Sequence, residues 1–145
     1  MMNKAVKLTI DSVLENVSLI GIATNAICSS IVDNKEEVYQ MELCVVEAVN
    51  NCIEHAYKNK SGHEVEVIIE LNLDNIIFKV CDTGENMEPG KVSEFSFNPD
   101  DIASLPEGGM GLFLIHQIMD EVSYENIGKR NILTMTKELH NQKTI

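Results

Sequence analysis

Apolar residues recur every three or four positions in two segments near the start of the chain, which is the spacing of one helix face. In the first segment they predict a helix from Asp11 or Ser12, either of which is a suitable N-cap, to about residue 31. Asp33-Asn34 then breaks the pattern and supplies a cap for a second helix, predicted over residues 36–57. The positions whose spacing predicts the first helix are Val13, Val17, Ile20, Ala23 or Thr24, and Ile27.

Other segments alternate apolar and polar residues, which is the period of a half-buried strand. They predict strands at residues 4–10, 64–73, 76–81, 122–126 and 132–138, with hairpin turns at Asp74-Asn75 and around Gly128. A third helix is predicted over residues 108–121. This order predicts an α+β two-layer sandwich: a mixed, mostly antiparallel sheet with three helices on one face, in a single domain over residues 1–145.

The stretch from Asp82 to Gly109 lacks either period and contains all three prolines of the chain. Loops this long inside a compact domain are uncommon and are often functional. We therefore expect an active-site lid over about residues 84–108.

Composition narrows the classes of function. The chain carries a net charge of −12, which argues against direct nucleic-acid binding and against an anionic membrane surface. No apolar run approaches the ~20 residues of a membrane span. The four cysteines show no CxxC spacing and lie in apolar segments, so we expect buried free thiols and a cytoplasmic protein.

Three polar side chains form one line along the second helix, which is apolar on most of its other sides over residues 41–57. Glu47, Asn51 and His55 follow one another at four-residue spacing and are predicted to share one face. One interpretation is a hydrogen-bonded polar cluster in the core. The other is a site in which Glu47 is a general base and the neutral oxygen of Asn51 binds Mg²⁺.

Two glycine-containing segments offer further chemistry. Asp82-Thr83-Gly84 ends a strand with a carboxylate that can accept a hydrogen bond from the exocyclic amine of a heterocycle, although the same tripeptide is also an ordinary turn. Gly108, Gly109 and Gly111 open the third helix, where exposed N–H groups suit a phosphate chain; a hinge without a ligand is the alternative.

Together these segments resemble the GHKL (Bergerat-fold) ATPases, and among them the anti-sigma factor serine kinases. EAVNNCIEHAY (residues 47–57) is similar to their N-box, DTGENMEP (82–89) to their first glycine box and EGGMGLFLIHQIMDEV (107–122) to their second. The resemblance covers nearly the whole chain.

The resemblance implies a role for each matching residue. Glu47 would activate a serine hydroxyl or water, and Asn51 would hold the Mg²⁺ that bridges the ATP phosphates. Asp82 would accept from the adenine amine, and residues 91–106 would form the lid. It also implies nucleotide contacts at the following positions: His55, Gly84, Met87, Gly108, Gly109, Met110, Gly111 and Leu112.

The chain departs from the family pattern at two places. Asn86 stands where the first glycine box usually has a second glycine; because asparagine tolerates a left-handed backbone, the turn can be kept there. Residues 129–132 replace the closing Gly-Thr of the family, so no threonine contact to adenine is carried over.

The function implied is an ATP- and Mg²⁺-dependent protein serine/threonine kinase. Its substrate would be a STAS-type anti-anti-sigma protein, its second partner a sigma factor, and its assembly a homodimer. Two alternatives remain open: a non-catalytic module that sequesters a partner, and an ATPase without a protein acceptor.

Overall fold

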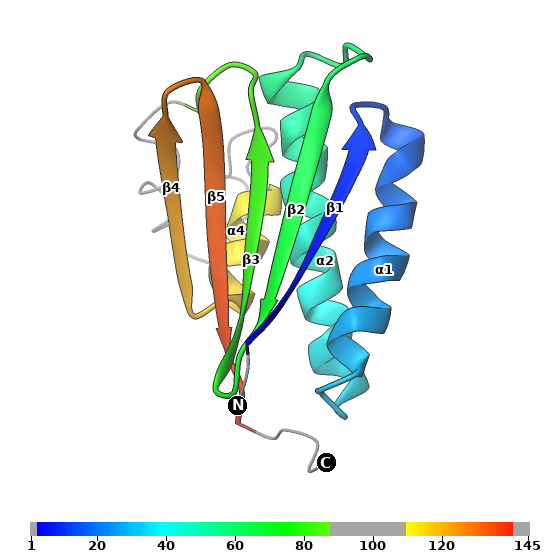
Figure 1. The fold of residues 1–145 in the computed structure, drawn as a ribbon, viewed down its shortest axis with the longest axis vertical. Coiled ribbons are helices and arrows are strands. Elements are labelled where there is room, and N and C mark those ends of the chain that lie inside the picture. The colour runs from blue at the N-terminus through cyan, green and yellow to red at the C-terminus, as the bar shows by residue number, and fades with distance from the viewer. Residues whose placement is uncertain (1–2, 88–109, 141–145) are drawn as a thin grey trace.

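The computed structural model describes residues 3–87 and 110–140, which form two layers (Figure 1). Strands β1 (Lys4–Asp11), β2 (Glu64–Leu71), β3 (Asn75–Asp82), β4 (Glu121–Ile127) and β5 (Arg130–Glu138) make one sheet. Helices α1 (Val17–Ser29), α2 (Lys35–Asn51) and α4 (Met110–Ile118) cover one face of it. Two short helical turns adjoin these helices: the 3₁₀ turn η1 (Leu14–Asn16) precedes α1, and the π-helical turn η2 (Cys52–Ala56) follows α2. The predicted α+β sandwich is confirmed.

The strand order is β1-β2-β3-β5-β4. All four pairings are antiparallel, so the described sheet is antiparallel throughout rather than mixed. Strand β5 lies between β3 and β4, which places Asn131 directly opposite Asp82. The chain therefore leaves the sheet at the end of β3 and returns through α4 to its outer edge.

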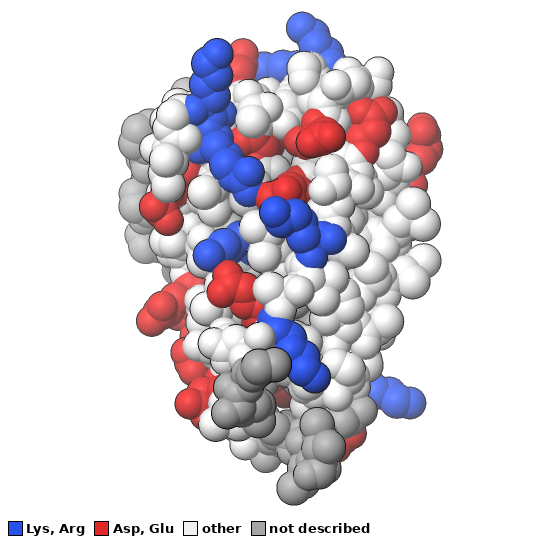
Figure 2. Space-filling model, in the orientation of Figure 1, with Lys and Arg blue, Asp and Glu red and all other residues white. Residues whose placement is uncertain are grey.

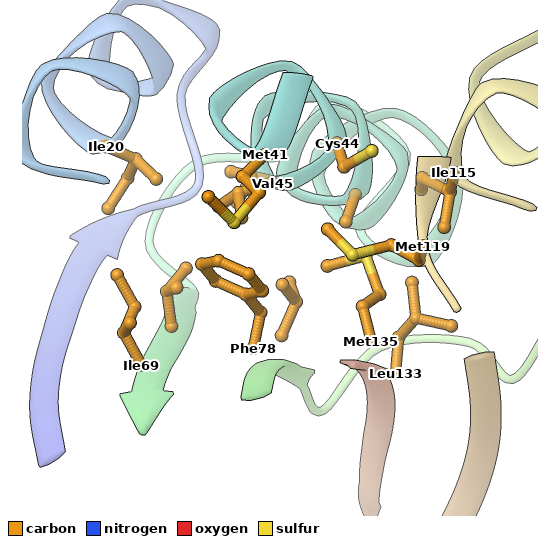
Figure 3. Close-up of a cluster of buried hydrophobic side chains, with 14 of the residues drawn as sticks. Ile20, Met41, Cys44, Val45, Ile69, Phe78, Ile115, Met119, Leu133 and Met135 are labelled. Carbon is orange, nitrogen blue, oxygen red and sulfur yellow. The ribbon is translucent and has the colours of Figure 1, made fainter. Parts of the chain in front are cut away.

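The core lies between the sheet and the helices (Figure 3). Phe78 at the centre of β3 is fully buried, and with no tryptophan in the chain the packing around it comes from aliphatic side chains and methionines. Each such side chain contributes roughly 1.5–3 kcal/mol on burial. Besides Phe78, the labelled core residues in the figure are Ile20, Met41, Cys44, Val45, Ile69, Ile115, Met119, Leu133 and Met135.

The cap predicted for the second helix is confirmed, because the Asn34 side chain accepts a hydrogen bond from the Glu37 amide at 3.0 Å. The cap predicted for the first helix is wrong. Ser12 is buried, donates to the Lys60 carbonyl at 2.6 Å and accepts from the His63 amide at 3.2 Å. It therefore joins β1 to the loop before β2, and α1 begins only at Val17.

The first hairpin turn lies one residue earlier than predicted. Leu71 pairs with Ile76, and the Asn72 amide donates to the Asn75 carbonyl at 3.0 Å, so Leu73 and Asp74 form the turn. The second hairpin turns at Gly128 as predicted, where a φ of +63° favours glycine. The four cysteines are buried and free, also as predicted.

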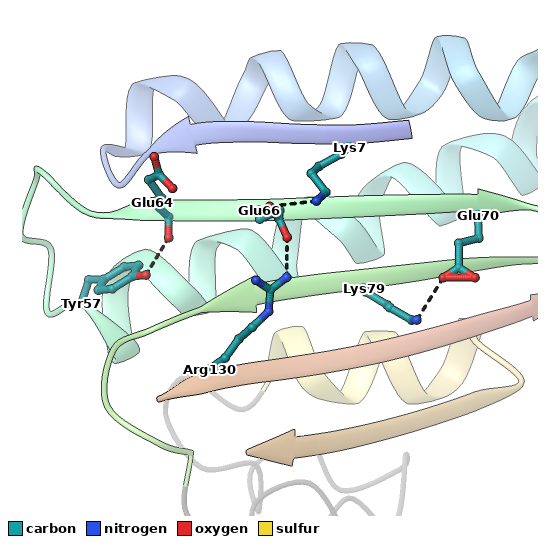
Figure 4. Close-up of polar contacts among 7 residues, drawn as sticks. All are labelled: Lys7, Tyr57, Glu64, Glu66, Glu70, Lys79 and Arg130. Carbon is teal, nitrogen blue, oxygen red and sulfur yellow. Dashed lines mark hydrogen bonds and ion pairs between the residues drawn. The ribbon is translucent and has the colours of Figure 1, made fainter. Parts of the chain in front are cut away.

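The face of the sheet opposite the helices carries both positive and negative side chains, several of which form ion pairs. Glu66 pairs with Lys7 and Arg130, and Glu70 pairs with Lys79 at 3.0 Å (Figure 4). Positive and negative side chains accordingly interleave over this face instead of forming one basic patch (Figure 2). Within the described ranges, no helix combines the length and the apolar character needed to cross a membrane.

Candidate functional site

The predicted site segments meet at one end of the helical layer. Gly111 in the first turn of α4 lies against Glu47 of α2, and Gly84 after β3 lies against Ala56 at the end of η2. Asp82 at the end of β3 is hydrogen-bonded to Asn131 of β5. Three segments that are distant in sequence are therefore neighbours, as their shared chemistry predicts.

Glu47 is half-buried, and its carboxylate touches the backbone of α4. A Cβ on Gly111 would lie 2.7 Å from Oε2 of Glu47, closer than non-bonded atoms approach. Only glycine leaves room for the carboxylate in this position. The glycine requirement at residue 111 thus arises from the candidate base as well as from any phosphate.

Asn51 is the last residue of α2, one helical turn beyond Glu47. Its Nδ2 atom is buried and has no hydrogen-bond partner among the described residues. An unpaired buried polar group costs about 1–3 kcal/mol, so native structures rarely keep one without a reason. The amide is therefore suited to a ligand that enters beside Glu47.

His55 separates from the other two polar residues. The helix widens into a π turn after Asn51, and His55 lies exposed in that turn whereas Glu47 and Asn51 are half-buried. The polar line predicted to run through all three residues therefore narrows to Glu47 and Asn51. Single π turns are frequent at functional sites because they change the direction of neighbouring side chains.

Asp82 is 8% exposed, and its Oδ1 accepts two hydrogen bonds. The Gly84 amide donates at 2.9 Å and Nδ2 of Asn131 donates at 2.7 Å. The thiol of Cys52 lies against the same carboxylate. Burial, together with the charge and hydrogen bond of Asp82, raises the pKa of Cys52 well above its usual value, so this thiol stays protonated.

The end of η2 leaves no room for a side chain at Gly84. A Cβ there would lie 2.3 Å from the carbonyl oxygen of Ala56, and the next residue, Glu85, donates its amide to that oxygen at 2.9 Å. The loop after β3 is therefore bonded to η2. The close neighbour that the structure describes for Gly84 is Ala56, and the contact of Gly84 with a nucleotide stays a prediction.

The hydroxyl of Tyr57 holds the same loop from the other side. It donates to the Glu64 carbonyl at 2.6 Å (Figure 4) and accepts from the Thr83 amide at 2.8 Å. The ring stacks on His63 with centroids 4.7 Å apart. Tyr57 thereby joins the end of η2, the start of β2 and the loop after β3.

Sequence reasoning missed Tyr57, Asn126 and Asn131. Asn131 lies within strand β5, where asparagine is disfavoured, and this is the signal that the sequence offers. Met87 donates its amide to the Tyr124 hydroxyl at 2.9 Å, and Leu112 has a buried side chain that packs in the core.

The remaining predictions for this region fall largely outside the described residues. Gly108 and Gly109 lie outside them, as does the lid beyond Met87. Met110 begins α4. Asn86 is described, and its backbone is not left-handed: the non-glycine residues with positive φ in the described ranges are Lys58 and Asn59. Asn86 therefore does not use the left-handed backbone that asparagine tolerates.

The residues of this site fit a magnesium ion that is held mainly by phosphates. Within residues 3–87 and 110–140, no group of three or more His, Cys, Asp and Glu side chains gathers around a common point. Mg²⁺ commonly binds through one or two protein ligands plus substrate phosphates, and it prefers oxygen. The side chain of Asn51 would offer one such ligand if its amide turned so that the oxygen took the place of the unpaired nitrogen.

Comparison with known proteins agrees with this arrangement. Residues 10–137 match the family described as histidine kinase-like ATPase domain. The serine-protein kinase RsbW of Staphylococcus aureus is 29% identical over 144 residues, covering 95% of this chain and 89% of that one. The serine-protein kinase RsbW of Oceanobacillus iheyensis is 27% identical over 115 residues, covering 77% of this chain and 73% of that one.

Two solved structures share the fold. A chain of the SiaB–SiaC complex from Pseudomonas aeruginosa superposes with a TM-score of 0.60 at 13% identity, covering 91% of this chain and 89% of that one. The histidine kinase AdeS of Acinetobacter baumannii superposes with a TM-score of 0.51 at 14% identity, covering 95% and 70%.

Proposed function

This chain belongs to the histidine kinase-like ATPase domain family, and on that premise we propose that it is an ATP-dependent protein serine/threonine kinase that requires Mg²⁺. The observation that carries the proposal is the contact between Glu47 and Gly111, because it brings a carboxylate to the glycine-rich start of a helix. The relatives named as serine-protein kinases support transfer to a hydroxyl, since their similarity extends over most of this chain.

Glu47 is the general base of the proposed reaction. It accepts the proton of a serine hydroxyl as the hydroxyl oxygen bonds to the γ-phosphorus of ATP, and the bond between that phosphorus and the β–γ bridging oxygen breaks to release ADP. Such transfer depends mainly on positioning and on charge neutralisation. Asn51 would hold Mg²⁺, which supplies positive charge to the phosphates. An acidic chain needs that charge, given its net −12.

The other end of the site binds the nucleotide base. Asp82 accepts a hydrogen bond from the adenine amine, with Gly84 and Met87 beside it. At the phosphate end, we propose that the backbone of the second glycine box contacts the triphosphate, at Gly108, Gly109, Met110, Gly111 and Leu112. His55 is exposed and is proposed only as a contact at the edge of the phosphates.

The protein partners follow from the same family resemblance. We propose a STAS-type anti-anti-sigma protein as substrate, a sigma factor as second partner, and a homodimer as the assembly. Helix α1 supports a protein contact, because it contains no charged residue and leaves Leu19 and Ile22 59% and 68% exposed. The four buried free thiols favour a reducing compartment such as the cytoplasm.

The test compares wild type with Glu47→Gln, using labelled ATP, Mg²⁺ and the candidate acceptor protein. We expect transfer to fall by roughly 10²–10⁴-fold, the usual contribution of a general base, while ATP affinity changes little. Glu42→Gln is the matched control, since Glu42 lies on the same helix but accepts a hydrogen bond from Asn25 of α1 at 2.8 Å. Its transfer rate should equal that of wild type.

Each outcome has a definite meaning. Normal transfer by Glu47→Gln refutes the base assignment. Phosphate release without labelled acceptor in wild type indicates an ATPase, and neither product indicates a partner-sequestering module.

A further inference from the structure

Three asparagine side chains form a continuous hydrogen-bonded chain that ends on Asp82. Nδ2 of Asn126 donates to Oδ1 of Asn86 at 3.0 Å and to Oδ1 of Asn131 at 2.8 Å. Nδ2 of Asn131 then donates to Oδ1 of Asp82 at 2.7 Å and to the carbonyl of Gly84 at 3.1 Å. The chain links the loop after β3 to both strands of the last hairpin.

The hydrogen bonds leave one orientation for the Asn131 amide. Among the described residues, the hydrogen-bond partners of its nitrogen are all oxygens: those of Asp82 and Gly84, and the carbonyl of Glu85 at 3.4 Å. Turning the amide over would place oxygen against all three, while its nitrogen would meet the Nδ2 donor of Asn126. Asn131 is 1% exposed, so water cannot replace these partners.

The network determines how many hydrogen-bond acceptor sites of the Asp82 carboxylate remain free. A carboxylate offers about four lone-pair sites. Asn131 and the Gly84 amide occupy Oδ1, and the Cys52 thiol, which also hydrogen-bonds to Asp82, is a weak donor. The carboxyl group is therefore held in one rotamer and retains capacity for one further strong donor.

The network also joins the two places where the sequence departs from its family pattern. Asn86 stands in place of a glycine, Asn131 lies in the segment 129–132 that replaces the closing Gly-Thr, and Asn126 donates to both. A threonine hydroxyl has a single hydrogen, so it cannot donate to Asp82 and Gly84 at once. The asparagine amide donates to both through its nitrogen and accepts from Asn126 through its separate oxygen. The two departures are therefore parts of one structural unit.

We propose that Asn131, oriented by Asn126, is a positioning residue that sets the Asp82 carboxylate for recognition of the 6-amino group of adenine. This inference rests on the proposed function, because it assumes that Asp82 faces the base. Asn131 itself contacts no substrate. Its effect is to make discrimination depend on the amine rather than on the purine ring.

The test measures the dissociation constants of ATP and of purine riboside triphosphate, which lacks the 6-amino group. Wild type should prefer ATP by about tenfold or more, as expected for a hydrogen bond to a charged group. Asn131→Thr should raise the dissociation constant of ATP by roughly tenfold and change that of the analogue by less than about threefold, so that the preference for ATP is lost. Asn126→Ala, at an exposed position, should shift the ratio in the same direction by less.

Asn72→Ala is the matched control. Asn72 donates to Oδ1 of Asn75 at 2.8 Å in the turn at the opposite end of the sheet, so its loss should leave the ratio unchanged. A preference for ATP that survives in both Asn131→Thr and Asn126→Ala overturns the inference. Equal weakening of both nucleotides also overturns it, because that result indicates a merely structural role.

The wild-type result separates this inference from the proposed function. If wild type binds both triphosphates without preference, the inference fails and the proposed kinase stands. If wild type binds neither, the proposed function fails and the inference fails with it.

Discussion

Gly111→Ala should separate folding from phosphoryl transfer in this protein. The new methyl carbon would lie 2.7 Å from Oε2 of Glu47, whereas ordinary contact begins at 3.4 Å. The carboxylate must therefore move by roughly 0.7 Å, and it can, since it is the end of a flexible side chain. Among the described residues, the nearest atoms to this methyl group outside α4 are all side-chain atoms of Glu47.

The expected magnitudes have opposite directions. Gly111 is the second residue of α4, and alanine favours a helix over glycine by up to about 1 kcal/mol, so the free energy of unfolding should stay level or rise. Transfer should fall, because a misplacement of about 1 Å in a catalytic group can cost 10²-fold. For the shift worked out above we expect a loss on the order of ten- to a hundredfold.

Transfer to the acceptor is measured at saturating ATP, so that a change in nucleotide affinity does not enter, and stability is measured by urea unfolding. Gly21→Ala is the control. Gly21 lies in α1, and its Cβ would meet two residues of α2, Val46 at 3.2 Å and Glu42 at 3.4 Å. It should affect stability alone. Adding Gly111→Ala to Glu47→Gln should cause no further loss, since both act on one group.

A Gly111→Ala variant that transfers phosphate within about twofold of wild type refutes this reasoning. A further loss in the Glu47→Gln background refutes it too, because the glycine would then act through another group.

Three further predictions concern stability and thiol chemistry. Gly84→Ala should destabilise by about 1–3 kcal/mol in urea, since its Cβ would lie 2.3 Å from the backbone oxygen of Ala56; an unchanged midpoint would contradict the close approach. Tyr57→Phe should cost about 1–3 kcal/mol in the same assay, because the Thr83 amide loses its acceptor. Burial raises the pKa of Cys44 to about 12 and raises that of the other three thiols as well. Ellman's reagent at pH 8 should therefore react with four thiols per chain only after unfolding, and rapid reaction of the folded protein would show that the thiols are accessible.

The sequence predicts the elements of the fold well where one residue period dominates. The second helix and both hairpins follow from strong patterns with recognisable caps or turns, and Asn34 and Gly128 act as expected. Ser12 was misassigned because its partners, Lys60 and His63, are distant in sequence. Local patterns do not reveal a hydrogen bond that forms only once the sheet has assembled.

The same distinction applies to the candidate site. Glu47, Asn51 and Asp82 stand out in sequence because each is a polar residue at the end of, or within, an apolar segment. Asn126 and Asn131 do not stand out. They lie more than 40 residues after Asp82 in the sequence and come near it only because β5 pairs with both β3 and β4. The departure from the family pattern at residue 131 was visible, but its partner at residue 126 was not.

The irregular backbone of this protein concentrates where the two halves of the site are joined. After Asn51 the α-helix becomes a π turn, and Lys58 and Asn59 then follow with φ of 55° and 61°. Left-handed backbone costs roughly 1–2 kcal/mol at each non-glycine residue, so such a sequence of conformations needs compensation.

That compensation comes from bonds between the helix end and the loop after β3. In a continued α-helix the carbonyl of Ala56 would accept from the amide of Lys60. Here Lys60 donates to Tyr57 instead, at 3.0 Å, and Ala56 is free to accept from Glu85. The distortion therefore attaches the loop that carries Gly84 to the helix that carries Asn51. Because both ends of the site share this junction, the position of Asp82 relative to Asn51 depends on the irregular turn and not on the regular elements alone.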